Sequence, residues 1–549
     1  MRRRATPAIL RGMPSRRHAL ALTLLAACTA PPPEEPVIIR YQPPPELAPS
    51  CDGQKQRPCY HGPAGTENVG RCRAGVEHCT AKGWTGTCDG EVLPRAETCS
   101  SDDDDDCDGA NTCQGTLLWA RNIVGGGQDT GGVYGSELSA FAVDGKGRMW
   151  LAGGFAGELD LGGLTLRSDT RAENVEPYLA RLDDDGTHPR GGNLGRTFGR
   201  AVGLRDEHRV QDLQIAADGD LYLLLWTNAR VECGDQSAGG AQRPNVLAHL
   251  GPDGALRRLV QLPLGQHDLA LRFSLGPDAL AVTGLSDNHG TILGPDDRGS
   301  FVLALDLARL RKRWRVDLAQ SFSYSRVAAI TDDFLVAGQF TGELALGNHK
   351  VRCAAQYCAG LARLDPQGGA RWLRSYGSAG SSMVDALIVD ELGIALTGST
   401  QQLDLGGGEI GLPEGLGSFV ARLDPDAKHL WSRYVPNSGR LTVRTLAPGP
   451  DGALYLGGEF SDSLRLGDFL LGGGRRDRRP NCDVFVARYT RDGSVDWAQY
   501  FGGHSFQEIG GLAFRPADST LVLAGTSSGE FKLGDTSITG RIFLAAIKP

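Results

Sequence analysis

Seven copies of one strand pattern fill the chain from residue 116 onward, and this repeat most limits the possible fold. Each copy has a short apolar segment that usually ends in Gly, such as residues 149–153, and a second segment such as Tyr178-Leu179-Ala180-Arg181-Leu182-Asp183. The first segment recurs around Leu221, Leu280, Leu335, Ile394, Leu454 and Leu521, and the second from Val246, Phe301, Gly360, Phe419, Phe485 and Phe543. A period of roughly 60 residues with about four strands is typical of a β-propeller blade.

A third segment built around Trp predicts how the ring of blades closes. The last copy ends at residues 543–547 without a Trp segment, whereas Leu117–Ile123, which contains Trp119, precedes the first copy. We therefore expect 117–123 to pair antiparallel with 543–547 and to cover the open edge of the last blade. The other outer strands are expected at Trp314, Trp372, Trp431 and Trp497. The predicted fold class is all-β: a seven-bladed β-propeller over residues 116–549, closed by an N-terminal outer strand and preceded by a small disulfide-rich module.

Several copies also carry the insertion Gly-x-x-Leu-x-Leu-Gly between the second and third strands. Its apolar pairs lie at Leu159/Leu161, Leu344/Leu346, Leu464/Leu466 and Phe531/Leu533. Alternation with a period of two predicts strands here as well, as a projecting hairpin or as an extension of the blade edge.

The first 27 residues are predicted to be an export signal. Arg16 and Arg17 precede a short apolar stretch, residues 18–27, which is too brief to span a membrane. The stretch ends in Leu25-Ala26-Ala27-Cys28, which resembles the lipobox of bacterial lipoproteins. The resemblance implies cleavage before Cys28, acylation of that residue and anchoring to a membrane. An ordinary secretory signal that happens to contain Cys is the alternative. The expected location is the cell envelope, as an outer-membrane lipoprotein facing the periplasm or the exterior.

Residues 28–50 and 51–115 are expected to form a tether and a separate module. Eight Pro residues in positions 29–50 favour an extended polyproline II conformation. The module carries eight of the 13 Cys residues, none of them in the Cys-x2-Cys spacing of zinc sites, so we expect a disulfide framework of undetermined pairing. These candidates are Cys51, Cys59, Cys72, Cys79, Cys88, Cys99, Cys107 and Cys113. A local disulfide between Cys353 and Cys358 is also expected, whereas Cys233 and Cys482 are left unassigned.

An acidic run between two of these cysteines is the candidate metal site. Asp104, Asp106, Asp108 and Gly109 match positions 1, 3, 5 and 6 of a calcium loop, in which alternate carboxylates converge on one hard cation. Position 12 would be Gly115, where such loops need Glu. Two interpretations therefore stay open: weak binding of a divalent cation, or a solvated acidic loop.

The same stretch resembles a known family of modules. Residues 57–66, Gly70-x-Cys72, residues 83–88 and Glu97-Thr98-Cys99 followed by the acidic run resemble the Cys-rich metal-binding-motif modules of myxobacterial surface lipoproteins. That family is named for its similarity to a methanotroph surface copper-binding protein. Ser100-Ser101 and Ala110-Asn111 replace the usual Asn-Gly and Asp-Glu around the run. The repeats from residue 116 onward resemble the bacterial SBBP-type β-propeller repeats that often follow such modules. Neither resemblance implies an enzymatic activity.

Charge and motifs then limit the function. A net charge of −8 argues against a nucleic-acid partner. Gly525-x-Ser527-x-Gly529 matches a hydrolase motif, but it lies where a strand runs into a loop rather than into a helix. No set of His, Arg, Tyr or carboxylates is seen to converge from several inner strands. The His residues show no repeated spacing and are expected to be scattered surface or loop residues; they include His249, His267, His289, His349 and His504.

We therefore expect a cell-surface binding or interaction module with a protein or glycan ligand, no enzymatic activity and no required cofactor. The first alternative is a protein that binds calcium or copper through the acidic Cys-rich module. The second alternative is a propeller-based hydrolase or lyase.

Overall fold

The chain divides into two compact units, Met1–Pro94 and Arg95–Pro549. The computed structural model describes residues 51, 53–81, 83–94, 104, 107, 109, 115–126, 137–167, 176–183, 186, 190–193, 208–227, 230–233, 236–240, 244–286, 299–318, 322–377, 380–412, 415–436, 439–472, 482–503, 505–534 and 536–549. None of these residues lies in an α-helix, and the one short 3-10 turn is η2 (Pro450–Gly452). The predicted signal, Cys28 and the tether lie outside the described residues.

The first unit is a small antiparallel sheet held by disulfides. Its strands are β1 (Gln56–Cys59), β2 (Gly75–Thr80) and β3 (Gly83–Trp84), in the order β1-β2-β3. The bonds Cys51–Cys79 and Cys59–Cys88 join segments 28 and 29 residues apart. Three of the four residues of β1 are exposed, so the cross-links take the place of an apolar core.

The second unit is a β-propeller, in which the described residues form seven large sheets, six of four strands and one of six. From the innermost strand outward, the sheets are β5 (Glu137–Val143), β6 (Met149–Phe155), β9 (Glu176–Leu182) and β10 (Arg190–Asn193); β11 (His208–Ile215), β12 (Leu221–Thr227), β15 (Asn245–Leu250) and β16 (Leu256–Gln261); β17 (Asp268–Leu275), β18 (Ala279–Ser286), β19 (Gly299–Asp306) and β20 (Lys312–Asp317); β21 (Phe322–Ile330), β22 (Asp333–Phe340), β25 (Cys358–Leu364) and β26 (Ala370–Tyr376); β27 (Ala386–Asp390), β28 (Gly393–Thr400), β31 (Gly417–Leu423) and β32 (His429–Val435); β33 (Leu441–Pro448), β34 (Leu454–Phe460), β37 (Asp483–Tyr489) and β38 (Val495–Phe501); and β39 (Gln507–Arg515), β40 (Thr520–Ser527), β43 (Ile542–Ile547) and β4 (Leu117–Gly126).

Short hairpins project from most sheets between the second and third strands. They include all four insertions for which the sequence predicted a hairpin or an edge extension. The hairpins are β7 (Glu158–Asp160) with β8 (Thr165–Arg167), β13 (Arg230–Cys233) with β14 (Gln236–Gly239), β23 (Glu343–Leu346) with β24 (His349–Arg352), β29 (Gln402–Asp404) with β30 (Glu409–Gly411), β35 (Ser463–Leu466) with β36 (Phe469–Gly472), and β41 (Phe531–Leu533) with β42 (Thr536–Ile538).

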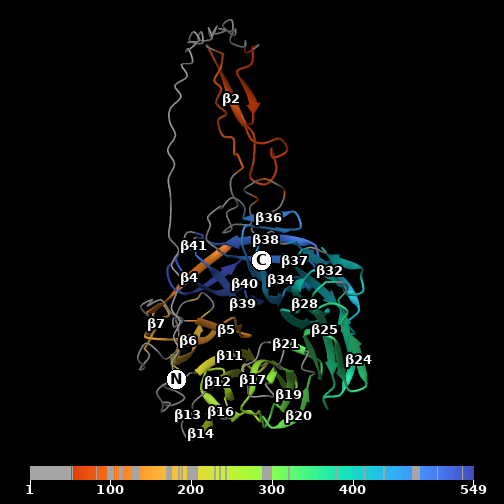
Figure 1. Ribbon diagram of the computed structural model, residues 1–549. Helices are drawn as coiled ribbons and strands as arrows, with labels where there is room; N and C mark the ends of the chain where they lie inside the picture. The colour runs from red at the N-terminus through yellow and green to blue at the C-terminus, as the bar shows by residue number, and fades with distance from the viewer. Residues whose placement is uncertain are drawn as a thin grey trace, which may run out of the picture. The chain divides into compact units, whose positions relative to one another are not determined.

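Strand β4 joins two ends of the repeat. It pairs antiparallel with β43, with Trp119 opposite Ala546 and Ile123 opposite Ile542, and in Figure 1 the orange β4 accordingly lies among blue strands. The predicted pairing of 117–123 with 543–547 is therefore confirmed. The far end of β4 pairs with β7, so the same strand also connects the last sheet with the hairpin of the first.

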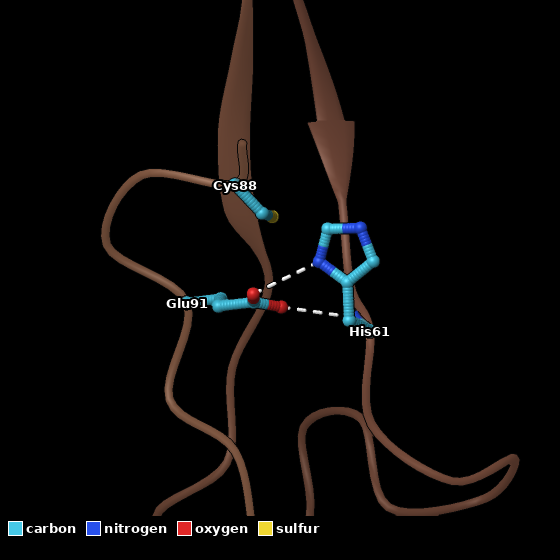
Figure 2. Close-up of side chains that lie close together, drawn as sticks. All are labelled: His61, Cys88 and Glu91. Atoms are coloured by element: carbon cyan, nitrogen blue, oxygen red, sulfur yellow. Dashed lines mark hydrogen bonds and ion pairs between the residues drawn. The ribbon is translucent and has the colours of Figure 1, made fainter. Parts of the chain in front are cut away.

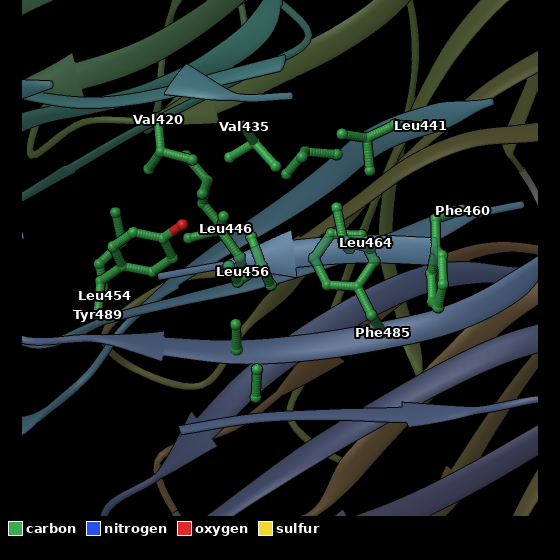
Figure 3. Packing of buried hydrophobic residues seen from close by; sticks show 14 of the residues in the cluster. Val420, Val435, Leu441, Leu446, Leu454, Leu456, Phe460, Leu464, Phe485 and Tyr489 are labelled. Atoms are coloured by element: carbon green, nitrogen blue, oxygen red, sulfur yellow. The ribbon is translucent and has the colours of Figure 1, made fainter. Parts of the chain in front are cut away.

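The apolar core lies between neighbouring sheets. In Figure 3, side chains from β31 and β32 of the fifth sheet meet those of β33, β34 and β37 of the sixth. Every residue of β34 is buried, because this second strand is covered by a sheet on each face. Burial on both faces explains why the second strand of each repeat is almost continuously apolar rather than alternating.

A recurrent bulge explains why this apolar segment ends in Gly. In six of the seven innermost strands the pairing with the second strand shifts its register by one residue, and the bulged backbone crosses closely over its neighbour. A Cβ added at Gly153 would lie 2.0 Å from the carbonyl oxygen of Glu137, and one at Gly284 would lie 2.0 Å from that of Leu269. Glycine is required here by close approach of backbone atoms.

Outer-strand Trp residues pack on a turn of the next sheet. The Nε1 of Trp431 in β32 donates to the carbonyl of Arg491 (2.9 Å), and its ring lies so close to Gly493 that an added Cβ would be 2.5 Å away. This glycine has a φ of +82°, which favours Gly for a second reason. Equivalent pairs are Trp314 with Gly368, and Trp119 with Gly186.

Candidate functional site

A cavity of about 440 Å³ lies where the seven innermost strands meet. Every innermost strand, or the residue directly before it, contributes to its wall, together with Thr526 of β40. The polar and charged lining residues are Ser139, Asp212, Gln214, Arg272, Arg326, Asp385, Thr442, Arg444, Thr445, Glu508 and Thr526. A half-enclosed site with converging charged groups is the default candidate for ligand binding in such a molecule.

The bulges place the charged side chains in this wall. Asp212 and Arg272 each directly follow the residue that the pairing skips. Arg326 follows the two residues skipped in β21, and Arg444 is itself the skipped residue of β33. A bulge turns a side chain away from the face it would otherwise occupy. One local feature, repeated in four inner strands, therefore contributes four charged residues to the cavity wall.

The three guanidinium groups are each held by a neighbouring inner strand. Arg272 Nη1 donates to the carbonyl of Gln211 (2.6 Å), and Arg326 Nε donates to the carbonyl of Asp385 (2.8 Å). Arg444 Nη2 donates to Glu508 Oε1 (2.7 Å). Because each reaches a different strand, the three cations are spread around the cavity wall.

The carboxylates of the wall are engaged by their own surroundings. Asp212 accepts backbone N–H bonds from Leu213 and Phe273, both at 3.0 Å. Asp385 Oδ2 accepts a hydrogen bond from the Ser399 hydroxyl (3.1 Å). Burial raises the pKa of both carboxyl groups, although nearby arginines oppose the shift. These hydrogen bonds leave the two groups less able to receive a donor from a ligand.

Glu459 lies behind Arg444 and is fully buried. Its Oε1 accepts a hydrogen bond from Arg444 Nε, whereas Oε2 has no hydrogen-bond partner among the described residues. Burial raises the pKa of Glu459 to about 7, although the Arg444 charge opposes this shift. The charge that supports Arg444 therefore changes with pH in the neutral range.

This set of residues corrects the sequence analysis, which found no charged groups converging from several inner strands. Asp212, Arg272, Arg326, Asp385 and Arg444 do converge. The sequence did contain a pattern that could have revealed them. Each of these charged residues interrupts or adjoins the apolar segment of an inner strand, at a similar place in its repeat. Without the bulge, whose position depends on pairing with another strand, a side chain there could equally face the neighbouring sheet.

The predicted metal residues are described only in part. Asp104 Oδ1 accepts the Cys107 N–H (2.7 Å) and Oδ2 accepts the Gly109 N–H (3.0 Å), so this carboxylate shapes its own loop. Asp106 and Asp108 lie outside the described residues. The distances among the three carboxylates therefore lie outside the described part of the structure.

A second possible metal cluster is found in the first unit, at His61, Cys88 and Glu91 (Figure 2). Glu91 Oε1 lies 2.9 Å from His61 Nδ1, and Oε2 accepts the His61 N–H at 2.8 Å. The Cys88 sulfur is already bonded to Cys59. A disulfide sulfur is not the thiolate that metals bind, so these residues form a hydrogen-bonded clasp rather than a metal site.

Most of the disulfide candidates can be checked. Cys51, Cys59, Cys72, Cys79, Cys88 and Cys107 are disulfide-bonded, and the expected Cys353–Cys358 bond is present. Cys99 and Cys113 lie outside the described residues, as does the side chain of Cys233. Cys482 is a buried free thiol whose pKa is raised by burial.

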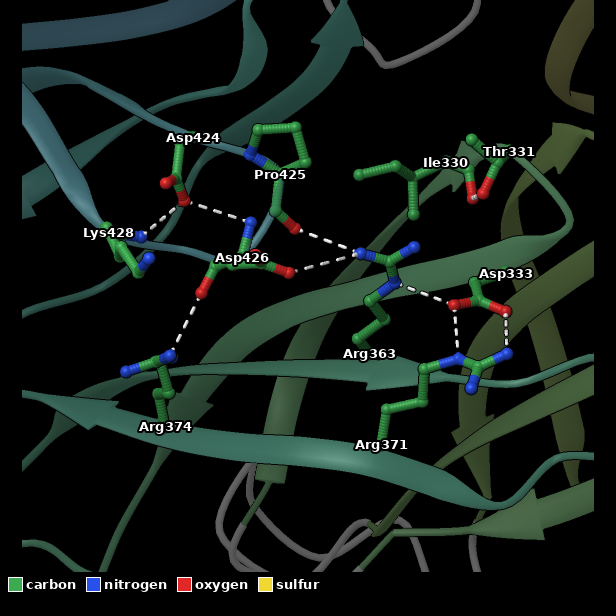
Figure 4. A network of polar contacts seen from close by, with 10 residues as sticks. All are labelled: Ile330, Thr331, Asp333, Arg363, Arg371, Arg374, Asp424, Pro425, Asp426 and Lys428. Atoms are coloured by element: carbon green, nitrogen blue, oxygen red, sulfur yellow. Dashed lines mark hydrogen bonds and ion pairs between the residues drawn. The ribbon is translucent and has the colours of Figure 1, made fainter.

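The Arg of the repeated Ala-Arg-Leu-Asp segment is structural in the fourth sheet. Arg363 Nε donates to Asp333 Oδ2 (2.7 Å), and its Nη1 reaches the carbonyl of Pro425 in the fifth sheet (3.1 Å; Figure 4). Arg371 binds the same carboxylate at 2.5 Å. Although burial opposes it, hydrogen bonds from Arg371 and Arg363 lower the pKa of Asp333. This network joins neighbouring sheets.

Two further motifs are explained by packing. His249 occupies the Arg position in the second sheet, stacks on Tyr222 (4.5 Å between ring centres) and contacts Asp220 at 2.6 Å, so its assignment as a scattered surface or loop residue is wrong. Ser527 lies at the end of β40, where its hydroxyl donates to the carbonyl of Gly529 (2.6 Å), and no helix follows in the described residues. The hydrolase motif therefore lacks its required turn. His289 and His504 lie outside the described residues.

Comparisons with known proteins add only distant likenesses. No family model and no curated protein matches the chain. Hydrazine synthase of Kuenenia stuttgartiensis is 10% identical with a TM-score of 0.38, covering 72% of this chain and 96% of that one. The β-propeller domain of the trilobed protease from Pyrococcus furiosus is 8% identical with a TM-score of 0.39, covering 72% and 94%.

Acylaminoacyl peptidase of Pyrococcus horikoshii is 9% identical with a TM-score of 0.40; the match covers 74% of this chain and 52% of the peptidase. At such values these likenesses say nothing about activity. Within the described part of the chain, we find no helix of the length and apolarity needed to cross a membrane.

Proposed function

We propose that this chain is an exported, lipid-anchored binding protein of the cell surface, whose propeller admits a charged group of a protein or glycan ligand into its central cavity. The observation that carries the proposal is the cavity itself, which is lined from all seven innermost strands or the residues directly before them and carries charged side chains from six of these places. A wall assembled from so many separate strands is rigid, and rigid, preformed polar groups favour recognition.

A closed ring of seven blades is part of the proposal. The innermost strands contact one another in the order β5, β11, β17, β21, β27, β33 and β39, and β39 contacts β5. The pairing of β4 with both β43 and β7 supports closure at the same place. Closure would leave no sheet edge open between the last blade and the first.

Export and lipid anchoring rest on the first unit and on the preceding sequence. Disulfides persist in oxidising compartments outside the cytoplasm, and the first unit depends on them. The lipobox resemblance at residues 25–28 supports acylation of Cys28, and Thr29 rather than Asp after that Cys supports an outer-membrane location. Replacement of Cys28 by Ser should abolish labelling with palmitate and release the protein from membranes.

Blocking the cavity tests the binding function directly. Ser139 lines the cavity, so Ser139→Trp would fill part of it, whereas Ser537→Trp places the same ring on the exposed hairpin strand β42. Immobilised full-length chain should retain specific envelope proteins or glycans, the Ser537→Trp control should retain them equally, and Ser139→Trp should lose them. Retention of the same material by both variants would refute a role for the cavity.

An enzymatic function is the second candidate, favoured by one observation. Asp212 and Asp385 line the cavity and have raised pKa values, as general acids do. Turnover of an envelope-derived glycan or peptide that is abolished by Asp385→Asn would support this function over simple binding. A metal-binding role for the acidic run is tested separately, by titrating the full chain and its Asp104→Asn variant with calcium and with copper.

A further inference from the structure

We propose that the charged group accepted by the cavity is an anion, a carboxylate or a phosphate, held by Arg272 with Arg326 and Arg444 arranged around it. This inference rests on the proposed binding function and names the chemistry of what that site takes.

The donors of Arg272 are the first reason. Its two described hydrogen bonds both use Nη1, to the carbonyls of Gln211 (2.6 Å) and Leu271 (3.0 Å). A guanidinium has five N–H donors, so the Nε and Nη2 groups keep three that no described residue accepts. The side chain is exposed, and it lies in the cavity wall. Nε and Nη2 together form the fork that binds a carboxylate or a phosphate through two parallel hydrogen bonds.

The state of the acidic groups is the second reason, because it separates an anion from a cation. Both oxygens of Asp212 already accept backbone N–H bonds, and Glu508 accepts from Arg444. Among the described residues no carboxylate forms an ion pair with Arg272. Arg272 therefore offers free donors, whereas Asp212 and Glu508 already accept hydrogen bonds, although the signs of the charges in the cavity are mixed.

The proximity of two arginines is the third reason. Burial lowers the pKa of Arg326, and the positive charge of Arg272 on the neighbouring inner strand lowers it further, whereas the carboxylates of Asp385 and Asp212 oppose the shift. An anion between these strands would reduce that repulsion and would gain hydrogen bonds from a site already held in place by backbone carbonyls.

Titration calorimetry on the full chain in neutral detergent at low salt tests the inference. The probes are inorganic phosphate, citrate, the polyamine spermidine and neutral glucose. We expect phosphate or citrate to bind, and Arg272→Gln to weaken that binding roughly 10- to 100-fold, the effect of removing hydrogen bonds to a charged group. Arg465→Gln removes the same charge from the exposed hairpin strand β35 and should leave binding unchanged. Arg272→Lys keeps the charge but loses the fork, so it should restore binding only in part.

The outcomes separate the possible sources of the anion. Binding of phosphate alone indicates a phosphate-bearing ligand, and binding of citrate alone a carboxylate-bearing one. The inference would be overturned if Arg272→Gln and Arg465→Gln lost the same amount of affinity for the anion, or if neither phosphate nor citrate bound. Thermal melting of each variant confirms that it is folded. If spermidine or glucose binds and Ser139→Trp abolishes that binding, the binding function stands and the anion inference fails. If Ser139→Trp retains every ligand, the binding function itself fails.

Discussion

The sheet β1–β3 and the propeller strands are stabilised by different means. Strand β1 is mostly exposed, whereas every residue of β6 is buried. The small sheet is held by cross-links between residues 28 and 29 positions apart, and the propeller by apolar side chains packed between sheets. The comparison shows two ways to offset the loss of conformational entropy when a chain folds. Cross-links restrict the unfolded state, and burial removes apolar surface from water.

Reduction of the disulfides should produce the largest difference in stability between the small sheet and the propeller. Each loop closed by Cys51–Cys79 or Cys59–Cys88 contributes about 3–4 kcal/mol in the chain-entropy model. We expect dithiothreitol to abolish the amide protection of β1 and β2 and to leave that of β34 intact, as measured by hydrogen exchange of the full chain. Full protection of β1 and β2 after complete reduction would show that the small sheet does not depend on its cross-links.

Removal of a Trp from each region should give the next largest difference. Trp431 is almost fully buried between two sheets, so Trp431→Ala should lower the free energy of unfolding of the propeller by about 3–5 kcal/mol. Trp84 of β3 is only half-buried, with the Arg57 guanidinium 4.4 Å from its ring. Trp84→Ala is the matched control and should leave the propeller transition in urea unchanged. Equal shifts in both variants would contradict the proposed contrast.

The stability of the propeller should depend on pH through the carboxyl group of Glu459. Its pKa is raised from 4.5 to about 7, so the folded protein binds this proton more tightly than the unfolded chain does. The stability contributed by Glu459 is therefore complete below about pH 4.5 and decreases as the pH rises to about 7.

Glu459→Gln keeps the shape of this side chain without the charge, so its unfolding free energy should exceed that of the wild type by about 2–4 kcal/mol at pH 8 and by much less at pH 4.5. Urea melts at several pH values measure this difference. A difference independent of pH would show that the carboxyl group is not responsible.

The disulfide of the propeller should have the smallest effect. Cys353 and Cys358 are only five positions apart, so their bond restricts the unfolded chain less than the long loops of the first unit do. The double substitution to Ser should cost about 2 kcal/mol and leave the propeller folded. Unfolding of the propeller in this variant would mean that it, too, depends on cross-links.

Much of the propeller could be predicted because its information is local and repeated. Apolar segments ending in Gly marked the second strands, and Trp119 marked the strand that pairs with 543–547. The pairing of eight clustered Cys residues could not be predicted, since composition and spacing allow many connections. The charged wall was missed for a related reason: Arg272 and Arg444 face the cavity only because of bulges that depend on strand pairing.

The sequence by itself determined the all-β class, the strand pattern, the strand that pairs with 543–547 and the presence of disulfides in the Cys-rich segment. Each follows from the period of apolar residues or from composition, which act over short stretches of chain. Only the tertiary structure decided which carboxylates are already hydrogen-bonded, which Arg272 donors stay open and why Glu459 titrates near neutral pH. These properties depend on burial and on contacts between strands about 60 residues apart along the chain.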